Sequence, residues 1–301
     1  MATLSKEVDE NGDTPTSSTY EGEVVFVRHN VTEEKQENKS IISDRIGGLF
    51  EKKQIALFWG ETRSFDPKDY DNRYAKSQFG LLKKCFEHGA IVVARYENKK
   101  DGAIIGEIKS DGVNKEFEPC GSVTLKIVHL ENARNEKFID HQRLIFSPGR
   151  QTICRYRDQD RDYIVKLFKR ETLPMKVNSL HPSQIEVLCY EYMAHKNLVD
   201  GLLLPIGRSM EAVDIIGIRA EPKSTIKVVA QVTCQNDRKK IKVKAERLSE
   251  FGGKKYFFGP QEKSVFVEGL NLELEYIAIE KVFDELLKVP EYEELIHEMI
   301  R

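Results

Sequence analysis

Two apolar runs separated by a short turn constrain the C-terminal half of this chain most strongly. Val213–Ile218 and Ile226–Thr233 both have the length of a strand and are rich in β-branched residues. The segment between them contains Pro222 and is typical of a turn. The pattern therefore predicts a buried hairpin. A carboxylate in an apolar strand is costly unless it is paired or binds a metal, so Asp214 is a candidate functional residue.

Helices are predicted on both sides of this hairpin. Pro182 or a Ser183 cap begins the first, which carries apolar residues at helical spacing and Glu186 at the edge of that stripe. Residues 237–251 form the second, and residues 254–258 form a further strand after two glycines. The predicted order is a helix with an acid, a strand with Asp, a strand with Gln, a helix and a strand.

This order, with Glu186, Asp214 and Gln231 at its polar positions, resembles the restriction-endonuclease-like nuclease fold, and the Gln variant is most similar to its Mrr-type branch. The resemblance covers residues 178–301. It implies a mixed sheet flanked by helices and metal-dependent hydrolysis of DNA. It also implies that Asp214, the Gln231 side-chain oxygen and the Val232 carbonyl bind Mg²⁺ or Mn²⁺, with Glu186 as a further candidate ligand.

Thr233 departs from the family pattern, which has a lysine at this position. A fixed cation there stabilises charge at a phosphoryl centre, and Thr carries no charge. Three explanations stay open. The lysine has moved to the following helix, where Lys239, Lys240 and Lys242 are close in sequence and Lys240 is the catalytic candidate; or the metal acts alone by lowering the pKa of a bound water; or the domain binds without cutting. Taken one at a time, Asp214, Gln231 and Glu186 each also have a structural explanation. Only their combination in this order of elements favours a metal site.

The N-terminal half is rich in short strands. Strands are predicted over 24–28, 54–59, 90–96, 103–108, 122–128 and 152–156, with one helix over 73–88. Many short strands with few helices are typical of a small β-barrel. The segments Phe26–Arg28, Ile55–Trp59, Ile91–Ala94 and Ile104–Ile108 resemble the PUA/EVE/YTH group of barrels over residues 22–157. That resemblance implies a domain that reads nucleic acid or a modified base.

Aromatic and basic residues are the candidates for nucleic-acid contact. Barrels of this group hold a base between aromatic rings, and such stacking contributes about 1–3 kcal/mol per base. Taken alone, a Trp or Phe on a strand more often packs in the core than binds a base. The polar, Pro-containing segment 65–74 is predicted to be an exposed loop. The candidates are Trp59, Phe58, Phe65, Tyr70 and Tyr74, and Arg238 and Lys239 in a basic patch with Lys240, Lys242 and Lys244.

The 301 residues suit a two-domain α+β chain. The predicted division is a disordered tail over 1–21, the barrel over 22–157, a linker helix over 158–177 and the nuclease-like domain over 178–301. A net charge of −2 excludes a uniformly basic protein. The five cysteines form no Cys-x-x-Cys motif, which argues against zinc and disulfides and favours the cytoplasm. No apolar run is long enough to span a membrane.

The two resemblances together imply a metal-dependent DNA endonuclease of a prokaryotic restriction or anti-phage defence system, whose N-terminal domain recognises modified or unmodified DNA. The alternative is a catalytically inactive nuclease fold that binds DNA or RNA or acts as a sensor. Cutting both strands favours a homodimer, and an activating ligand or a defence-system partner is a further expectation.

Overall fold

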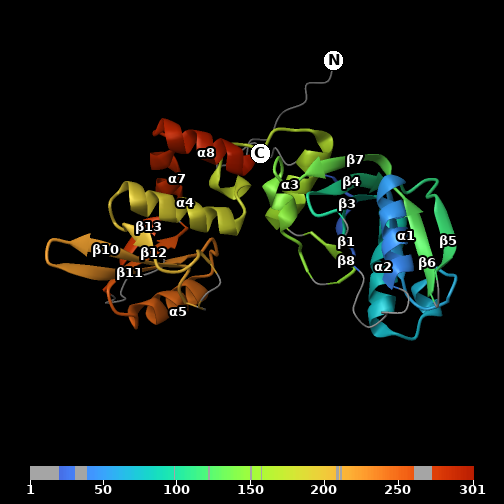
Figure 1. Ribbon diagram of the computed structural model, residues 1–301, viewed down its shortest axis with the longest axis horizontal. Helices are drawn as coiled ribbons and strands as arrows, with labels where there is room; N and C mark the ends of the chain where they lie inside the picture. Colours follow the sequence, from blue (N-terminus) through green and yellow to red (C-terminus); the bar gives the residue numbers. More distant parts are fainter. Residues whose placement is uncertain are drawn as a thin grey trace, which may run out of the picture. The chain divides into compact units, whose positions relative to one another are not determined.

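The computed structural model describes residues 20–30, 39–97, 99–120, 123–149, 151–156, 158–207, 210, 212–260 and 273–301. The chain divides into two compact units, an N-terminal unit, Met1–Glu171, and a C-terminal unit, Thr172–Arg301. Both units contain helices and sheets, so the chain has the predicted α+β class (Figure 1). Nearly all of the predicted disordered tail lies outside the described residues. No helix in the described part of the chain is long and apolar enough to cross a bilayer.

The N-terminal unit contains two sheets. The five-stranded sheet has the order β7-β4-β3-β1-β8, and the three-stranded sheet has the order β2-β6-β5. Their strands are β1 (Glu23–His29), β2 (Gln54–Phe58), β3 (Ala90–Tyr96), β4 (Gly102–Ile108), β5 (Lys115–Cys120), β6 (Val123–His129), β7 (Glu131–Lys137) and β8 (Ile153–Arg155). β1 pairs with β3 and β8 whereas β2 pairs with β6, so the described strands do not show the single barrel that the sequence predicts.

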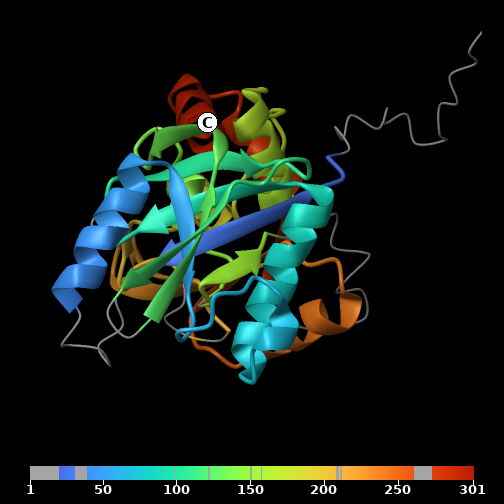
Figure 2. The same cartoon turned by 90° about the vertical axis from the view of Figure 1, so that its right-hand side faces the viewer.

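Helices α1 (Lys39–Glu51) and α2 (Arg73–His88) lie to either side of these strands in Figure 2. α2 covers the predicted residues, and the Asn72 side chain caps it by accepting from the backbone N–H groups of its first turn. α1 is absent from the prediction because it contains Gly47 and Gly48, and adjacent glycines are typical of a turn. Ile46 and Leu49 of α1 are buried in the core shared by both sheets, and this burial stabilises the helix.

Helix α3 (Asp158–Lys169) covers the other face of the five-stranded sheet. The sequence places this segment in a linker. In the structure, Tyr163, Ile164 and Val165 are buried, and the Arg134 guanidinium donates to the carbonyls near the end of the helix. The helix therefore belongs to the N-terminal unit because its apolar stripe packs there.

Buried His29 connects the two sheets. Its Nε2 accepts a hydrogen bond from the Ala56 N–H at 3.0 Å, and its ring stacks on Tyr96 with centroids 4.5 Å apart. Burial lowers the pKa of His29 to about 4. The folded protein therefore keeps this imidazole neutral at pH values where an unfolded chain protonates it.

We expect the free energy of unfolding to decrease as the pH falls from about 6.5 to about 4, because only the unfolded state takes up the His29 proton there. The shift corresponds to about 3 kcal/mol, fully present above the unfolded pKa. Urea unfolding across this pH range measures it. A His29→Gln variant should lose this part of the pH dependence, and identical pH profiles for the two proteins would contradict the assignment.

The C-terminal unit is built on one five-stranded sheet with the order β13-β12-β11-β10-β9. β9, β10 and β11 are antiparallel neighbours, and β11, β12 and β13 run parallel. The strands are β9 (Gly201–Leu202), β10 (Ile215–Glu221), β11 (Ser224–Val232), β12 (Lys254–Gly259) and β13 (Glu275–Ala278). The hairpin predicted from the two apolar runs is β10–β11, with Ile215 opposite Ala230.

Helices cover both faces of this sheet. α4 (Pro182–His195), α7 (Ile279–Leu286) and α8 (Pro290–Ile300) belong to the core on one side, and α5 (Arg238–Ser249) forms the core on the other (Figure 1). Asp237 caps α5, and Pro182 begins α4 after a His181 cap. The small core under α5 is Ile216, Val229 and Phe257 from the sheet, packed against Ile241, Ala245 and Leu248.

Candidate functional site

Asp214 and Gln231 lie opposite one another at one end of the β10–β11 hairpin. The Asp214 N–H donates to the Ala230 carbonyl at 2.9 Å, and Ala230 is also the register partner of Ile215, so the regular pairing of β10 ends before Asp214. Val213 and Ile216 both belong to the core under α5, so side chains do not alternate strictly across Asp214. Gln231, two residues after Val229 of the same core, lies on the α5 side of β11.

The predicted ligand residues contact one another directly. Asp214 Oδ2 accepts hydrogen bonds from the Val232 N–H at 2.7 Å and from Gln231 Nε2 at 2.5 Å. The same Gln231 nitrogen donates to the Val232 carbonyl at 2.9 Å. Burial raises the pKa of the Asp214 carboxyl, while the hydrogen bond from Val232, the charge of Lys244 and the hydrogen bond from Gln231 oppose that rise.

The residues fit a divalent cation. Gln231 Oε1 is buried and has no hydrogen-bond partner among the described residues, which is costly for an acceptor. Gln231 Nε2 now lies between Asp214 Oδ2 and the Val232 carbonyl, and rotating the amide by half a turn would bring Oε1 to that position and make three oxygens available to one cation. Carboxylate, amide and carbonyl oxygens are the hard ligands that Mg²⁺ binds. In the described ranges, no group of three His, Cys, Asp or Glu side chains is arranged for a metal, so this cluster depends on the amide and carbonyl oxygens.

Glu186 on α4 approaches the same end of the sheet. Its Oε2 lies 2.5 Å from the position that a Cβ on Gly207 would occupy, and the Gly207 N–H donates to the Asp214 carbonyl at 2.8 Å. Gly207 has a φ of +79°, a conformation that favours glycine. After burial and Cys234, the charges of Asp214 and Glu186 both raise the pKa of the Cys189 thiol. The carboxylates of Asp214 and Glu186 therefore both lie close enough to Cys189 to act on the same thiol.

Thr233 has a structural role. It is 4% exposed, its N–H donates to the Phe258 carbonyl at 2.9 Å, and its hydroxyl accepts from the Gln235 N–H at 3.4 Å. These bonds hold the chain as it leaves β11. The side chain itself carries no charge.

The lysine whose charge acts on the pKa of Asp214 is Lys244 rather than Lys240. The Lys240 Nζ lies 4.0 Å from Asp237 at the start of α5, and its side chain is 65% exposed. Lys244, one turn further, is half-buried next to the fully buried Ala245, and its charge opposes the rise in the pKa of Asp214. The sequence signal for Lys244 was its position beside the apolar stripe of the helix. The predicted contacts Arg238 and Lys239 are exposed in the first turn of α5.

The aromatic candidates of the N-terminal unit separate into core and surface residues. Tyr70 is 6% exposed, and its ring stacks on Phe79 with centroids 4.2 Å apart. The predicted exposed loop is therefore wrong for Tyr70, because the turn at Pro67–Asp69 directs this side chain onto α2. Trp59 is half-buried and donates to the Gln78 amide oxygen at 3.3 Å. Tyr74 is 66% exposed.

Phe58 and Phe65 are both half-buried. Phe58 meets the His29 ring edge-on at 6.3 Å, and Phe65 packs against the rings of Phe86 and Phe117. Both therefore contribute to packing of the N-terminal unit.

Tyr70 and Tyr74 should respond oppositely to truncation. Tyr70→Ala removes a buried, stacked ring, so we expect it to lower the free energy of unfolding by about 3 kcal/mol. Tyr74→Ala should change it by less than about 0.5 kcal/mol because the ring is exposed. Urea unfolding measures both. A Tyr70→Ala protein of undiminished stability that had lost DNA binding would restore Tyr70 as a base-stacking residue.

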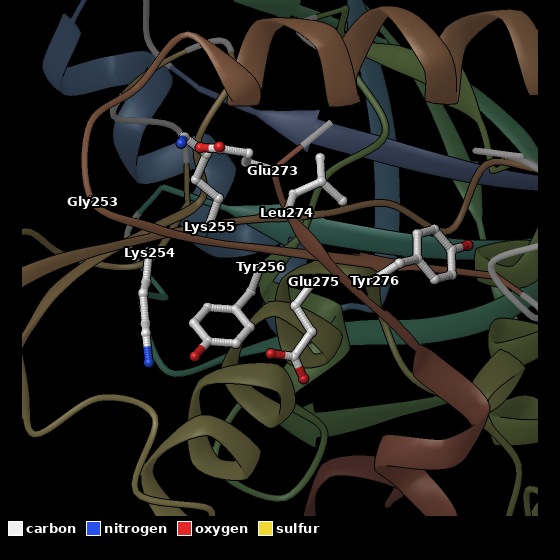
Figure 3. Close-up of a pocket in the computed structure, with 8 residues that line it drawn as sticks. All are labelled: Gly253, Lys254, Lys255, Tyr256, Glu273, Leu274, Glu275 and Tyr276. Atoms are coloured by element: carbon white, nitrogen blue, oxygen red, sulfur yellow. The ribbon is translucent and has the colours of Figure 1, made fainter. Parts of the chain in front are cut away.

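A separate pocket of about 430 Å³ lies at the opposite end of the parallel strands (Figure 3). It is lined by the first residues of β12 and by residues at the start of β13, including Lys254, Tyr256 and Glu275. Figure 3 shows Tyr256 and Glu275 on the same side of the two strands. Asp214 and Val232 are outside its lining, because Val232 aligns with Phe258 near the other end of β12.

Comparisons with known proteins establish no family. No protein-family model matches the chain, and no curated protein matches it. Among solved structures, the DNA modification-dependent restriction endonuclease AspBHI aligns with a TM-score of 0.27 and 11% sequence identity, over 82% of this chain and 79% of that chain. That TM-score is too low to establish a shared fold.

Proposed function

We propose that the C-terminal unit is a metal-dependent DNA endonuclease domain and that the N-terminal unit is a PUA-like domain that recognises DNA, in a restriction or anti-phage defence role. The observation that carries the proposal is the cluster of Asp214, Gln231 and the Val232 carbonyl. In it, the buried Gln231 Oε1 has no partner among the described residues, and a lysine on α5 acts on the carboxylate.

Each residue of the cluster has a role in this proposal. Asp214, Gln231 and the Val232 carbonyl would hold Mg²⁺ or Mn²⁺, which when bound lowers the pKa of a water and polarises the phosphate. The Val232 N–H fixes the Asp214 carboxylate in place. Lys244 supplies the positive charge that the related nucleases take from their strand lysine, and it stabilises negative charge on the phosphate oxygens. Glu186 would be a further ligand or would orient the water.

DNA would reach this site along α5. Arg238 and Lys239 are exposed on the helix that also carries Lys244. Phosphate contacts from such side chains position a duplex without reading its sequence. Cleavage of both strands would require a second copy of the domain, so a homodimer is part of this proposal.

One observation favours a second function. Thr233 places no charge at the expected lysine position, and its hydroxyl is engaged in a turn. A catalytically inactive nuclease fold that binds DNA or RNA is therefore the alternative, with an activating ligand or a partner protein as a variant of it.

The test is cleavage by the full chain. Unmodified duplex DNA, modified phage DNA and single-stranded RNA are each incubated with Mg²⁺, with Mn²⁺ and with a chelator. We expect cleavage of at least one DNA with metal and none with chelator. Cleavage of RNA alone would contradict DNA as the substrate. DNA binding without cleavage under every condition would favour the inactive alternative.

A further inference from the structure

Two arginines lie side by side in the five-stranded sheet of the N-terminal unit. Arg28 on β1 and Arg95 on β3 are register partners on parallel strands, and neighbouring strands are about 4.7–4.9 Å apart. Val27 and Ala94, which flank them, face the core shared by both sheets, so the two arginines lie on the opposite face, which α3 covers, near the C-terminal ends of the two strands. Both side chains are half-buried.

The hydrogen bonds of this pair are to neutral acceptors. Arg28 donates to the Ser147 hydroxyl at 2.7 Å and to the Gly149 carbonyl at 3.1 Å. Arg95 donates to the Ile145 carbonyl at 2.9 Å. Across the residues that the structure describes, neither guanidinium forms an ion pair with a carboxylate. Burial and the charge of Arg28 lower the pKa of Arg95, as expected for two neighbouring like charges.

Other arginines of the same unit are neutralised. Arg155 contacts both carboxylate oxygens of Glu23 at 2.6 and 2.7 Å, and Arg45 pairs with Glu118 at 2.6 Å. Like charges directly opposite one another on neighbouring strands destabilise a sheet. An adjacent, acid-free arginine pair is therefore unfavourable unless an anion lies between the two side chains.

Each guanidinium lies over an aromatic ring. Arg28 lies over the ring of Phe26 with 5.7 Å to the centroid, and Arg95 lies over the ring of Phe138 with 5.0 Å. Each guanidinium has five N–H donors, and the bonds above occupy only some of them. Planar, oriented donors of this kind match the oxygens of a phosphate, which they bind in pairs.

We propose that Arg28 and Arg95 together bind one phosphate group of the DNA backbone. This inference rests on the proposed recognition of DNA by the N-terminal unit and adds the residues that hold the strand. The Ser147 hydroxyl, which already contacts Arg28, is placed to contribute a further hydrogen bond.

The experiment measures binding of the full chain to a short fluorescent DNA duplex by anisotropy, in the presence of a chelator and over a series of salt concentrations. The Arg28→Gln, Arg95→Gln double variant should bind about tenfold more weakly. Its slope of log K against log salt should be smaller by about 1, because one phosphate contact is lost.

The matched control is the Arg45→Gln, Arg155→Gln double variant, which removes the same charge from two arginines that already have carboxylate partners. We expect it to bind with nearly the wild-type affinity and salt slope. Equal weakening in both double variants would overturn the proposal, since net charge alone would then explain the loss. Wild-type affinity and slope in the Arg28, Arg95 variant would also overturn it.

Urea unfolding of each variant excludes a folding defect. If the double Gln variant unfolds, single Arg→Lys variants at the two positions test the same point, because Lys keeps the charge but loses the paired donors. They should bind more weakly with an unchanged salt slope, and unchanged affinity would contradict the proposal. Binding is measured without metal, so absence of cleavage would overturn the nuclease proposal alone, whereas absence of duplex binding by the wild type would overturn this one.

Discussion

Replacing Asp214 by Asn is expected to reduce metal-dependent DNA cleavage by a factor on the order of 10³ while leaving the protein folded. The substitution removes the only formal negative charge from the Asp214, Gln231 and Val232 cluster. The amide oxygen of Asn can still accept the hydrogen bond that the Val232 N–H donates to Asp214 at 2.7 Å. Because burial raises the pKa of Asp214, a neutral side chain of the same shape should not lower stability.

Single-turnover cleavage, anisotropy binding and urea unfolding measure the three parts of this expectation. Asp237→Asn is the matched control, because it removes a carboxylate that caps α5 and Asn is an equally good cap. We expect Asp237→Asn to cleave at nearly the wild-type rate. An Asp214→Asn protein that cleaves as fast as the wild type would exclude this cluster as the metal site.

The elements that the sequence predicted well are those with a strong apolar pattern. The β10–β11 hairpin and helices α2, α4 and α5 follow from runs or stripes of apolar residues with caps at their ends. Strands β5 and β7 were missed because they are largely exposed and polar, so neither alternates clearly. α1 was missed because its two adjacent glycines are typical of a turn. The burial of Ile46 and Leu49, which stabilises this helix, depends on tertiary packing that the sequence does not show.

In the candidate site, too, the apolar pattern predicted some residues, whereas side-chain directions were not predicted. Asp214 was identifiable because a carboxylate in an apolar run needs a partner, and the hairpin register then places Gln231 opposite it. The choice among the lysines of α5 depends on the direction each side chain takes around the helix, which sequence spacing alone did not resolve. Tyr70 was misplaced because a short 3₁₀ turn redirects its ring into the core.

Replacing Lys244 by Ala is expected to slow metal-dependent cleavage about 10²-fold, with DNA binding reduced far less. Lys244 is half-buried beside Ala245 and its charge acts on Asp214, so in the proposed site its ammonium group would stabilise charge on the phosphate. Alanine is the strongest helix former, and α5 should therefore remain intact. Single-turnover rates at saturating DNA separate the cleavage step from binding.

Lys240→Ala is the control that makes this prediction specific. It lies one turn earlier on the same helix, carries the same charge and is 65% exposed beside Asp237. Loss of Lys240 should weaken DNA binding slightly through general electrostatics and leave the cleavage rate within about twofold. If Lys240→Ala slows cleavage as much as Lys244→Ala, the basic surface as a whole matters and Lys244 has no specific role in the cleavage step. If neither variant slows cleavage, the metal acts without a protein cation, and Thr233 is tolerated because no charge is needed there.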